Sequence, residues 1–221
     1  MFPVRDDRAA DLLEAVQLDG MRGVIARALT QSLRDMAQLT LHSRVDASQL
    51  VAFRESFAAD SRPSVNELVL ACVACALPRH PSVNATLEDD TILRWRCVHL
   101  GMAVAVDAGL VVPVIRNAET LSLAALREEA ARLGRAARDG ALTMAEIRGA
   151  TFTVSNLGGF GIDAFTPIIN PPQVAILGVG RLDQGSMTLS LTIDHRALDG
   201  VPGARFLQDL AEVFRDPGGA L

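Results

Sequence analysis

Apolar residues follow three different patterns along the first part of the chain. In residues 18–36 they recur every three or four positions, which predicts an amphipathic helix with one buried stripe. In residues 39–45 they alternate with polar residues, which is typical of a strand. Residues 67–77 are apolar on nearly every side. This last segment is therefore expected to be a central helix, ended by Pro78.

Short polar motifs indicate where three helices begin. Ser64 and Glu67 have the spacing of a capping box, in which each side chain bonds the other's backbone N–H. Thr143 and Glu146 repeat that spacing and predict a second helix start. Asp46 can cap a segment beginning at residue 47.

The rest of the chain mixes helices and strands without a regular repeat. We expect helices at 121–138 and 201–214, and strands at 92–106, 110–115, 151–155, 174–179 and 187–194. Turns are expected at 107–109 and 183–185. This pattern predicts an α/β fold with a mixed β-sheet flanked by helices, formed by residues 18–221 after an N-terminal extension at 1–17.

Composition narrows the class of protein. The net charge is −5 and every basic side chain is Arg, so no basic footprint for nucleic acid is present. No apolar run is long enough to cross a membrane, and the first residues lack the pattern of a signal peptide. An odd number of cysteines, three, fits a reducing cytoplasmic location better than a disulfide framework.

The strongest chemical signal is the segment 192–200, Thr-Ile-Asp-His-Arg-Ala-Leu-Asp-Gly. A predicted strand ends at His195, and Asp199 follows four residues later, before Gly200. Histidine can take and return a proton near neutral pH, so His195 is a candidate general base. From spacing alone, a surface histidine beside a capping aspartate is an equally good interpretation.

A second signal is a strand that leads into a glycine-rich turn at 151–161. Ser155 could act there as a nucleophile or as a hydrogen-bond donor to an oxyanion. The segment has neither a Gly-x-Ser-x-Gly elbow nor a dinucleotide fingerprint, which argues against a hydrolase serine. The alternative is an ordinary serine in a tight loop.

Other reactive or charged residues have weaker patterns. Cys72 and Cys75 are spaced like a zinc pair but lack a second pair, so we expect buried thiols and no metal site. Arg116 and Arg94 could bind phosphate groups through their planar guanidinium groups, or could be solvated surface residues.

Together, these segments closely resemble the catalytic domain of the dihydrolipoamide acyltransferases, the E2 components of 2-oxoacid dehydrogenase complexes. His195, Asp199 and Gly200 match the family's His-x-x-x-Asp-Gly signature, and Ser155-Asn156 matches its Ser/Thr turn. The resemblance extends from about residue 18 to the end of the chain. Further matching segments are 20–22, 25–27, 81–85, 101–106, 109–116, 137–140 and the Pro-Pro-Gln-Val-Ala-Ile-Leu-Gly run at 171–178.

The resemblance implies a role for each residue. His195 would be the general base and Ser155 would stabilise the oxyanion. If the substrate is coenzyme A, Arg116 and Asn156 are the candidates to contact it. Asp199 would form a structural ion pair, with Arg22 as the candidate partner, rather than orient the histidine as in a serine-hydrolase triad.

The resemblance also implies an assembly. Family members share a chloramphenicol-acetyltransferase-like trimeric acyltransferase fold, with each active site between two subunits of a homotrimer. Trimers often build larger cubic or dodecahedral cores that work with lipoyl domains and the E1 and E3 components. Most members carry lipoyl domains upstream of the catalytic domain, but this sequence has only about twenty residues before its first matching helix. The lipoyl group is therefore expected on a separate domain or chain.

The implied reaction is acyl transfer between a lipoyl dithiol and coenzyme A. Residues 161–167 look most like acetyl-transferring members, while residues 37–42 lack the usual Pro-His and aromatic residues of the substrate pocket. The segment between the strands ending near 179 and 194 is also shorter than usual. The alternatives are a coenzyme A-dependent acetyltransferase for a small hydroxylic acceptor, and a non-catalytic core scaffold.

Overall fold

The computed structural model describes residues 11–107 and 109–221. The expectation that the chain starts without a signal peptide falls mainly on residues 1–10, which lie outside the described residues, as does Ala108 in the turn expected at 107–109. The first helix begins at Gly20, two residues after the predicted start of the domain. The boundary between residues 17 and 18 stays a prediction.

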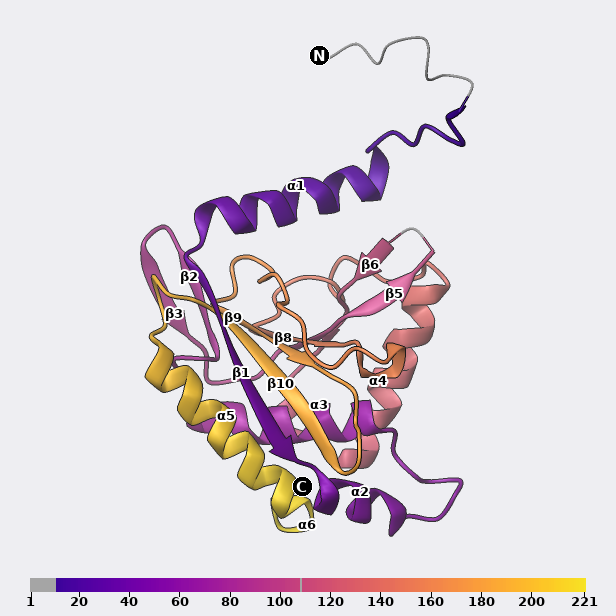
Figure 1. The fold of residues 1–221 in the computed structure, drawn as a ribbon, viewed down its shortest axis with the longest axis vertical. Helices are drawn as coiled ribbons and strands as arrows, with labels where there is room; N and C mark the ends of the chain where they lie inside the picture. The colour runs from indigo at the N-terminus through magenta and orange to yellow at the C-terminus, as the bar shows by residue number, and fades with distance from the viewer. Residues whose placement is uncertain (1–10, 108) are drawn as a thin grey trace.

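A six-stranded mixed sheet forms the centre of the molecule (Figure 1). Its strands, in spatial order, are β1 (Gln38–Asp46), β10 (Ser186–Asp194), β9 (Ala175–Val179), β8 (Phe152–Asn156), β4 (Leu100–Met102) and β7 (Val114–Ile115). Strands β1, β10 and β9 pair antiparallel, β9, β8 and β4 pair parallel, and β4 pairs antiparallel with β7. The predicted mixed sheet is confirmed.

Two small antiparallel pairs lie outside this sheet: β2 (Ala85–Glu88) with β3 (Thr91–Arg94), and β5 (Val104–Val106) with β6 (Gly109–Val111). The single strand predicted at 92–106 is therefore wrong, because it divides into β3, β4 and β5, which belong to three sheets. The strand predicted at 110–115 is also divided, at Pro113, which has no N–H for a ladder.

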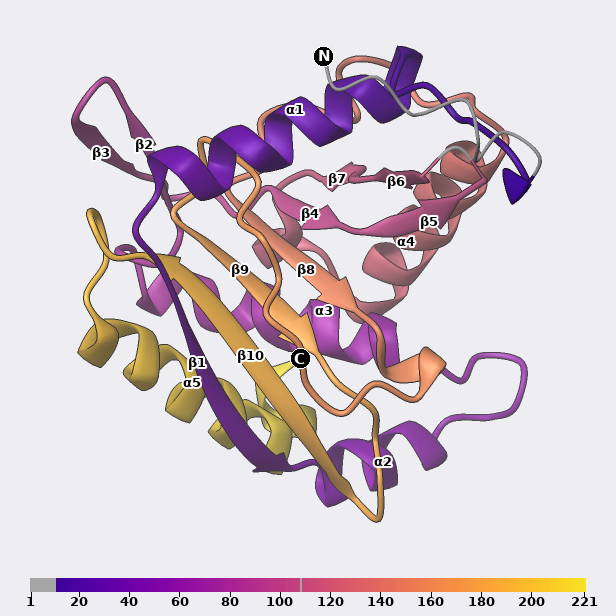
Figure 2. The same cartoon turned by 45° about the horizontal axis from the view of Figure 1, so that its top comes forward.

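The helices are α1 (Gly20–Asp35), α2 (Ser48–Glu55), α3 (Val65–Ala76), α4 (Leu123–Arg138), α5 (Gly200–Arg215) and α6 (Pro217–Ala220). Single 3₁₀ turns are η2 (Leu77–Arg79), η3 (Ala118–Thr120) and η4 (Gly158–Phe160). Eight of the twelve residues of α3 are buried, which confirms its predicted central position. Figure 2 shows α3 and α5 on one side of the sheet and α1 across the other. No helix in the described part of the chain is both long and apolar enough to cross a bilayer.

Helix α1 lies apart from the core. Of its residues only Gly23 and Ser32 are buried, whereas Met21, Val24 and Leu33 are each at least half exposed. The predicted buried stripe is thus only partly covered in a single chain, because Ile25 and Leu29 are half-buried while the other large apolar side chains of the helix stay exposed.

The two predicted capping boxes have different outcomes. At the start of α3 the Glu67 N–H donates to Ser64 Oγ (3.2 Å), and the Ser64 N–H donates to Glu67 Oε2 (2.7 Å). The Thr143 N–H likewise donates to Glu146 Oε2 (2.8 Å), but only a turn follows, so the helix predicted there is wrong. The Ser48 N–H donates to Asp46 Oδ1 (2.9 Å), but α2 begins at Ser48 and its N-cap is Ala47, so Asp46 lies one residue before the capping position.

This difference can be measured by unfolding. We expect Ser64→Ala to lower the free energy of unfolding by about 1 kcal/mol, because α3 loses the acceptor for one of its first N–H groups. Thr143→Ala is the matched control and should change it by less than about 0.5 kcal/mol, since no helix depends on that exposed turn. Urea unfolding followed by circular dichroism compares the two, and equal losses would contradict the assignment.

Candidate functional site

His195 lies directly after β10, an interior strand of the central sheet, at the end where this strand finishes. Its N–H donates to the Ala37 carbonyl (2.9 Å), so the backbone at this point is tied to the segment before β1. Its side chain is 46% exposed, which leaves the imidazole free to receive a substrate proton. The structure thus places His195 where a general base can act.

The residues on either side of His195 form an ion pair. The Asp194 carboxylate is fully buried, and the Arg196 guanidinium donates to both of its oxygens, with distances of 2.7–3.0 Å. Asp194 Oδ1 also accepts from the N–H groups of Ala37 and Arg196, both at 3.2 Å. One carboxylate therefore joins the start of β1 to the turn that carries the histidine.

Asp199 lies at the N-cap of α5, with its carboxylate 3.6 Å from His195 Nδ1. That distance is too long for a hydrogen bond, and the Asp199 side chain is 81% exposed. A triad-like orientation of His195 by Asp199 is therefore absent from a single chain. Gly200 has no close neighbour, since a Cβ atom there would meet nothing within 4 Å.

Ser155 lies near the end of β8 and lines a cavity of about 360 Å³. A second cavity, of about 430 Å³, shares Asn66, Ala103, Asn156 and Phe160 with it. We call the two together the Ser155 groove. Its walls come from α3, α4, the β5–β6 pair and the turn after β8, and Arg138 of α4 adds a positive charge to the wall of the cavity that Ser155 lines.

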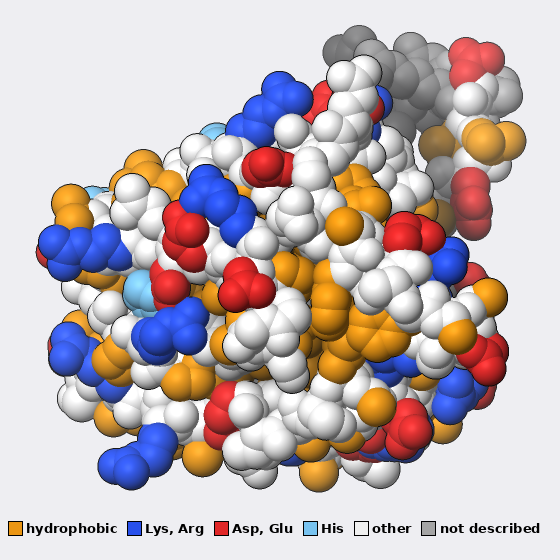
Figure 3. Space-filling view, turned by 90° about the horizontal axis from the view of Figure 1, so that it is seen from below, with side chains coloured by type: hydrophobic (Ala, Val, Ile, Leu, Met, Phe, Trp, Pro, Cys, Tyr) orange, Lys and Arg blue, Asp and Glu red, His pale blue; other side chains and the backbone are white. Residues whose placement is uncertain are grey.

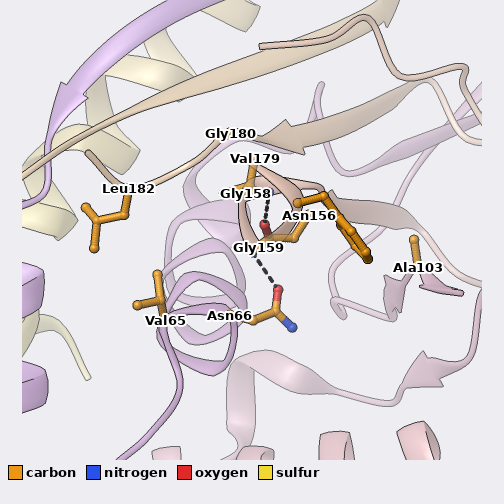
Figure 4. Close-up of a pocket in the computed structure, with 10 residues that line it drawn as sticks. Val65, Asn66, Ala103, Asn156, Gly158, Gly159, Val179, Gly180 and Leu182 are labelled. Carbon is orange, nitrogen blue, oxygen red and sulfur yellow. Dashed lines mark hydrogen bonds between the residues drawn. The ribbon is translucent and has the colours of Figure 1, made fainter. Parts of the chain in front are cut away.

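The turn after β8 is held by an asparagine pair (Figure 4). Asn156 Nδ2 donates to Asn66 Oδ1 (3.0 Å), and Asn156 Oδ1 accepts from the Gly158 N–H (2.9 Å). Glycine is required at positions 158 and 180, because a Cβ atom would lie 2.5 Å or less from a backbone oxygen. The glycine-rich turn thus lets β8, β9 and α3 meet closely beside Ser155.

His195 and Ser155 lie at opposite ends of the sheet within one chain. Ser155 is in register with Gly178, Gly178 is in register with Ser190, and His195 lies five residues beyond Ser190. With a strand rise of about 3.3 Å and a strand spacing of about 4.8 Å, the two residues are separated by about 20 Å. One chain therefore does not bring this base and this hydroxyl together.

Within the chain, the two arginines with predicted site roles have other neighbours. The Arg116 guanidinium donates to the carbonyls of Ala145 (2.8 Å), Gly149 (3.2 Å) and Arg148, so it holds the loop that leads into β8. Arg22 lies near Gly109, and among the described residues no ion pair joins it to Asp199. The roles predicted for both arginines stay predictions.

The cysteines are free thiols. Cys72 is buried within α3, and burial raises the pKa of its thiol far above the usual value. Among the described residues no group of three or more His, Cys, Asp or Glu side chains is placed to hold a metal ion.

Sequence reasoning missed two features of the site: the Asp194–Arg196 pair and Asn66. Asp194 continues a row with Ser190 and Thr192 that alternates with apolar residues, a pattern typical of a solvent-exposed face, so nothing in it indicates that the carboxylate is buried. Asn66 is the second residue of α3, and nothing in its local pattern indicates that it reaches the turn after β8.

Comparison with known proteins places these features in a family. The model for the 2-oxoacid dehydrogenases acyltransferase catalytic domain matches residues 11–221. The dihydrolipoyllysine-residue acetyltransferase component of the acetoin cleaving system of Bacillus subtilis is 37% identical over 233 residues, covering 97% of this chain and 58% of that protein. The succinyltransferase component of the mitochondrial 2-oxoglutarate dehydrogenase complex of Saccharomyces cerevisiae is 37% identical over 220 residues, covering 91% and 48%. The chain thus spans about half the length of these relatives.

Solved structures agree with this placement. Dihydrolipoamide acetyltransferase from Azotobacter vinelandii superposes with a TM-score of 0.91 at 33% identity, covering 100% of this chain and 98% of that chain. A chloramphenicol acetyltransferase has a TM-score of 0.58 at 12% identity over 91% of this chain and 99% of its own, which shows a shared fold. The predicted fold and the predicted resemblance are both confirmed: this chain belongs to the family of 2-oxoacid dehydrogenase acyltransferase catalytic domains.

Proposed function

We propose that this domain transfers an acyl group, acetyl in the first instance, between the dithiol of a lipoyl group and coenzyme A. The observation that supports this most directly is the free imidazole of His195, held at the end of β10 in a chain that matches the acyltransferase family along nearly its whole length.

In the proposed reaction His195 removes the proton from one thiol, and the thiolate attacks the carbonyl carbon of the other partner's thioester. The tetrahedral intermediate carries a negative oxygen, to which the Ser155 hydroxyl donates a hydrogen bond. Collapse breaks the original carbon–sulfur bond, and the departing thiolate takes the proton back from the histidine. No acyl-enzyme forms, so much of the catalysis comes from orienting two substrates in one place.

The proposed active site lies between two chains of a homotrimer. The separation of His195 and Ser155 within one chain supports this, because the base of one chain can meet the hydroxyl only of a neighbour. The uncovered apolar side of α1 supplies surface for such a contact. The cubic core of a pyruvate dehydrogenase multienzyme complex contains a chain that superposes on this one with a TM-score of 0.91, so a cubic core is the favoured larger assembly.

The proposed substrates and partners follow from this arrangement. The Ser155 groove would admit coenzyme A, with Arg138 in its wall as a cation for phosphate groups. The lipoyl group would be carried by a separate domain or chain, and the E1 and E3 components would be partners. The surface supports protein partners rather than nucleic acid, since acidic and basic side chains are interspersed on the face drawn in Figure 3. We place the protein in the cytoplasm, where its free thiols would stay reduced.

Two other functions are weaker. Acetylation of a small hydroxylic acceptor is suggested by the fold shared with chloramphenicol acetyltransferase, but the identity to that protein is only 12%. A non-catalytic scaffold would not need an exposed imidazole at the end of β10 or a hydroxyl in a glycine-bounded groove.

The direct test is a substrate panel. We expect free dihydrolipoamide to accept acetyl from acetyl-CoA, with kcat/KM falling roughly tenfold or more for longer acyl groups, since each extra methylene must fit the pocket. Chloramphenicol serves as the hydroxylic acceptor. Faster acetylation of chloramphenicol would favour the hydroxyl-acceptor function, and a folded trimer without thiol transfer would favour the scaffold.

A second test addresses the base. His195→Ala should lower kcat by roughly 10²–10⁴-fold, because no other group can take the thiol proton. Cys75→Ala is the control, since this thiol lies on α3 and bonds the Ala220 carbonyl far from the proposed site, and its turnover should match the unchanged protein. Near-normal turnover by His195→Ala would refute the assignment of the base.

A third test addresses the shared site. Ser155→Ala alone should lower kcat by roughly 10²–10³-fold through loss of the oxyanion donor. When the His195→Ala and Ser155→Ala chains are co-assembled in equal amounts, each mixed trimer has one intact site. Activity should therefore recover to about a quarter of the normal value. If it stays at the level of the single variants, the two residues do not share a site between chains.

A further inference from the structure

We propose that Asp194, clamped by Arg196, is a positioning residue that fixes the His195 imidazole for proton transfer. The inference rests on the proposed function, because it assumes that His195 is the general base. It adds a residue pair that the His-x-x-x-Asp-Gly signature does not include.

The contacts of Asp194 surround the histidine on both sides. Its side chain accepts the N–H of Ala37, whose carbonyl in turn accepts the N–H of His195 at 2.9 Å. Its side chain also accepts the N–H of Arg196, the next residue along the chain. The backbone on either side of the imidazole is thus fixed to one buried carboxylate.

The main chain of Asp194 extends the same framework. Its N–H donates to the Val174 carbonyl (2.8 Å), and its carbonyl accepts from Ala197 and Leu198 (both 2.9 Å). The polar groups of Asp194 therefore bond either the residues that precede β1 and β9 or the turn of residues 195–198. No similar framework surrounds Asp199, whose exposed carboxylate is beyond hydrogen-bond distance of the imidazole.

Arg196 offsets the energetic cost of burying the Asp194 carboxylate. An unpaired carboxylate in the interior costs several kcal/mol, whereas a two-pronged guanidinium contact satisfies both oxygens. The hydrogen bond to Asp194, together with the charges of Asp194, Asp35 and Asp90, raises the pKa of the Arg196 guanidinium, so it stays charged. Because the Arg196 side chain is 44% exposed, it closes the turn from the solvent side.

The test compares Asp194→Asn, Arg196→Lys and Arg196→Met in the assembled protein. Asp194→Asn places an amide NH₂ against the guanidinium donors, and Arg196→Lys keeps the charge but loses the planar fork. We expect Asp194→Asn to lower kcat per trimer roughly 10–100-fold, because small displacements of a catalytic group are that costly. Both KM values should change little, and Arg196→Lys should lie between Asp194→Asn and the unchanged protein. Arg215→Gln, which breaks an exposed ion pair with Glu212 on α5, is the matched control and should leave kcat unchanged.

Analytical ultracentrifugation and thermal unfolding separate positioning from general stability, since kcat is counted per trimer. If Arg196→Met does not fold, Arg196→Lys still gives the result. A crystal structure of Asp194→Asn should show the fold intact and the imidazole displaced by about 0.5 Å or more.

Three outcomes would overturn the inference: Asp194→Asn with kcat within about twofold of normal, a loss explained fully by fewer trimers, or an imidazole that has not moved. The proposed function can fail separately. If the unchanged protein transfers no acyl group, that function is refuted, while the crystal structure of the variant still decides whether Asp194 positions the ring.

Discussion

The change of strand direction at β9 is the constraint on which the proposed site depends. This strand runs parallel to β8 and antiparallel to β10, so the carboxyl ends of β8 and β10 lie at opposite edges of the sheet. Ser155 is near the carboxyl end of β8, and His195 comes directly after the carboxyl end of β10. The two residues therefore lie at opposite ends of the strands. Because β9 lies between the strands that carry these two residues and runs parallel to only one of them, the proposed site needs two molecules to bring them together.

The buried carboxylate beside the base has a second role in this arrangement. A histidine that meets its partner hydroxyl across a subunit boundary cannot take its orientation from that hydroxyl alone. The framework around Asp194 supplies an orientation from within the chain, through the first residues of β1 and the turn before α5. In the proposed site the base is thus oriented from within its own chain, while the asparagine pair at the end of β8 holds the turn that follows the proposed oxyanion donor.

Local sequence patterns correctly predicted the central helix and two strands of the central sheet. The capping box at Ser64 and the apolar run of α3 both agree with the structure, as do β1 and β10, whose sequences alternate apolar and polar residues. The resemblance to the acyltransferase family named His195 and Ser155, and the structure gives each an environment suited to its proposed role.

The features that were predicted wrongly or missed have several causes, some local and some tertiary. The hairpin between β2 and β3 turns at Asp89 and Asp90, both with positive φ, and two aspartates are a weak turn signal. At Thr143 only half of the capping box forms, because the Glu146 N–H donates to the Thr143 carbonyl and not to its hydroxyl, and the bonds close a turn. The Asp194–Arg196 pair joins residues that are local to each other, yet its importance comes from Ala37, which is distant in sequence.

The uncovered side of α1 has a consequence for how the protein must be handled. Met21, Val24 and Leu33 of this helix are exposed to water, and covering them with another surface would stabilise the protein. Folding and association are then linked by mass action, and the apparent melting temperature should rise with protein concentration. Melting temperatures of different preparations of this domain can therefore be compared only at the same protein concentration.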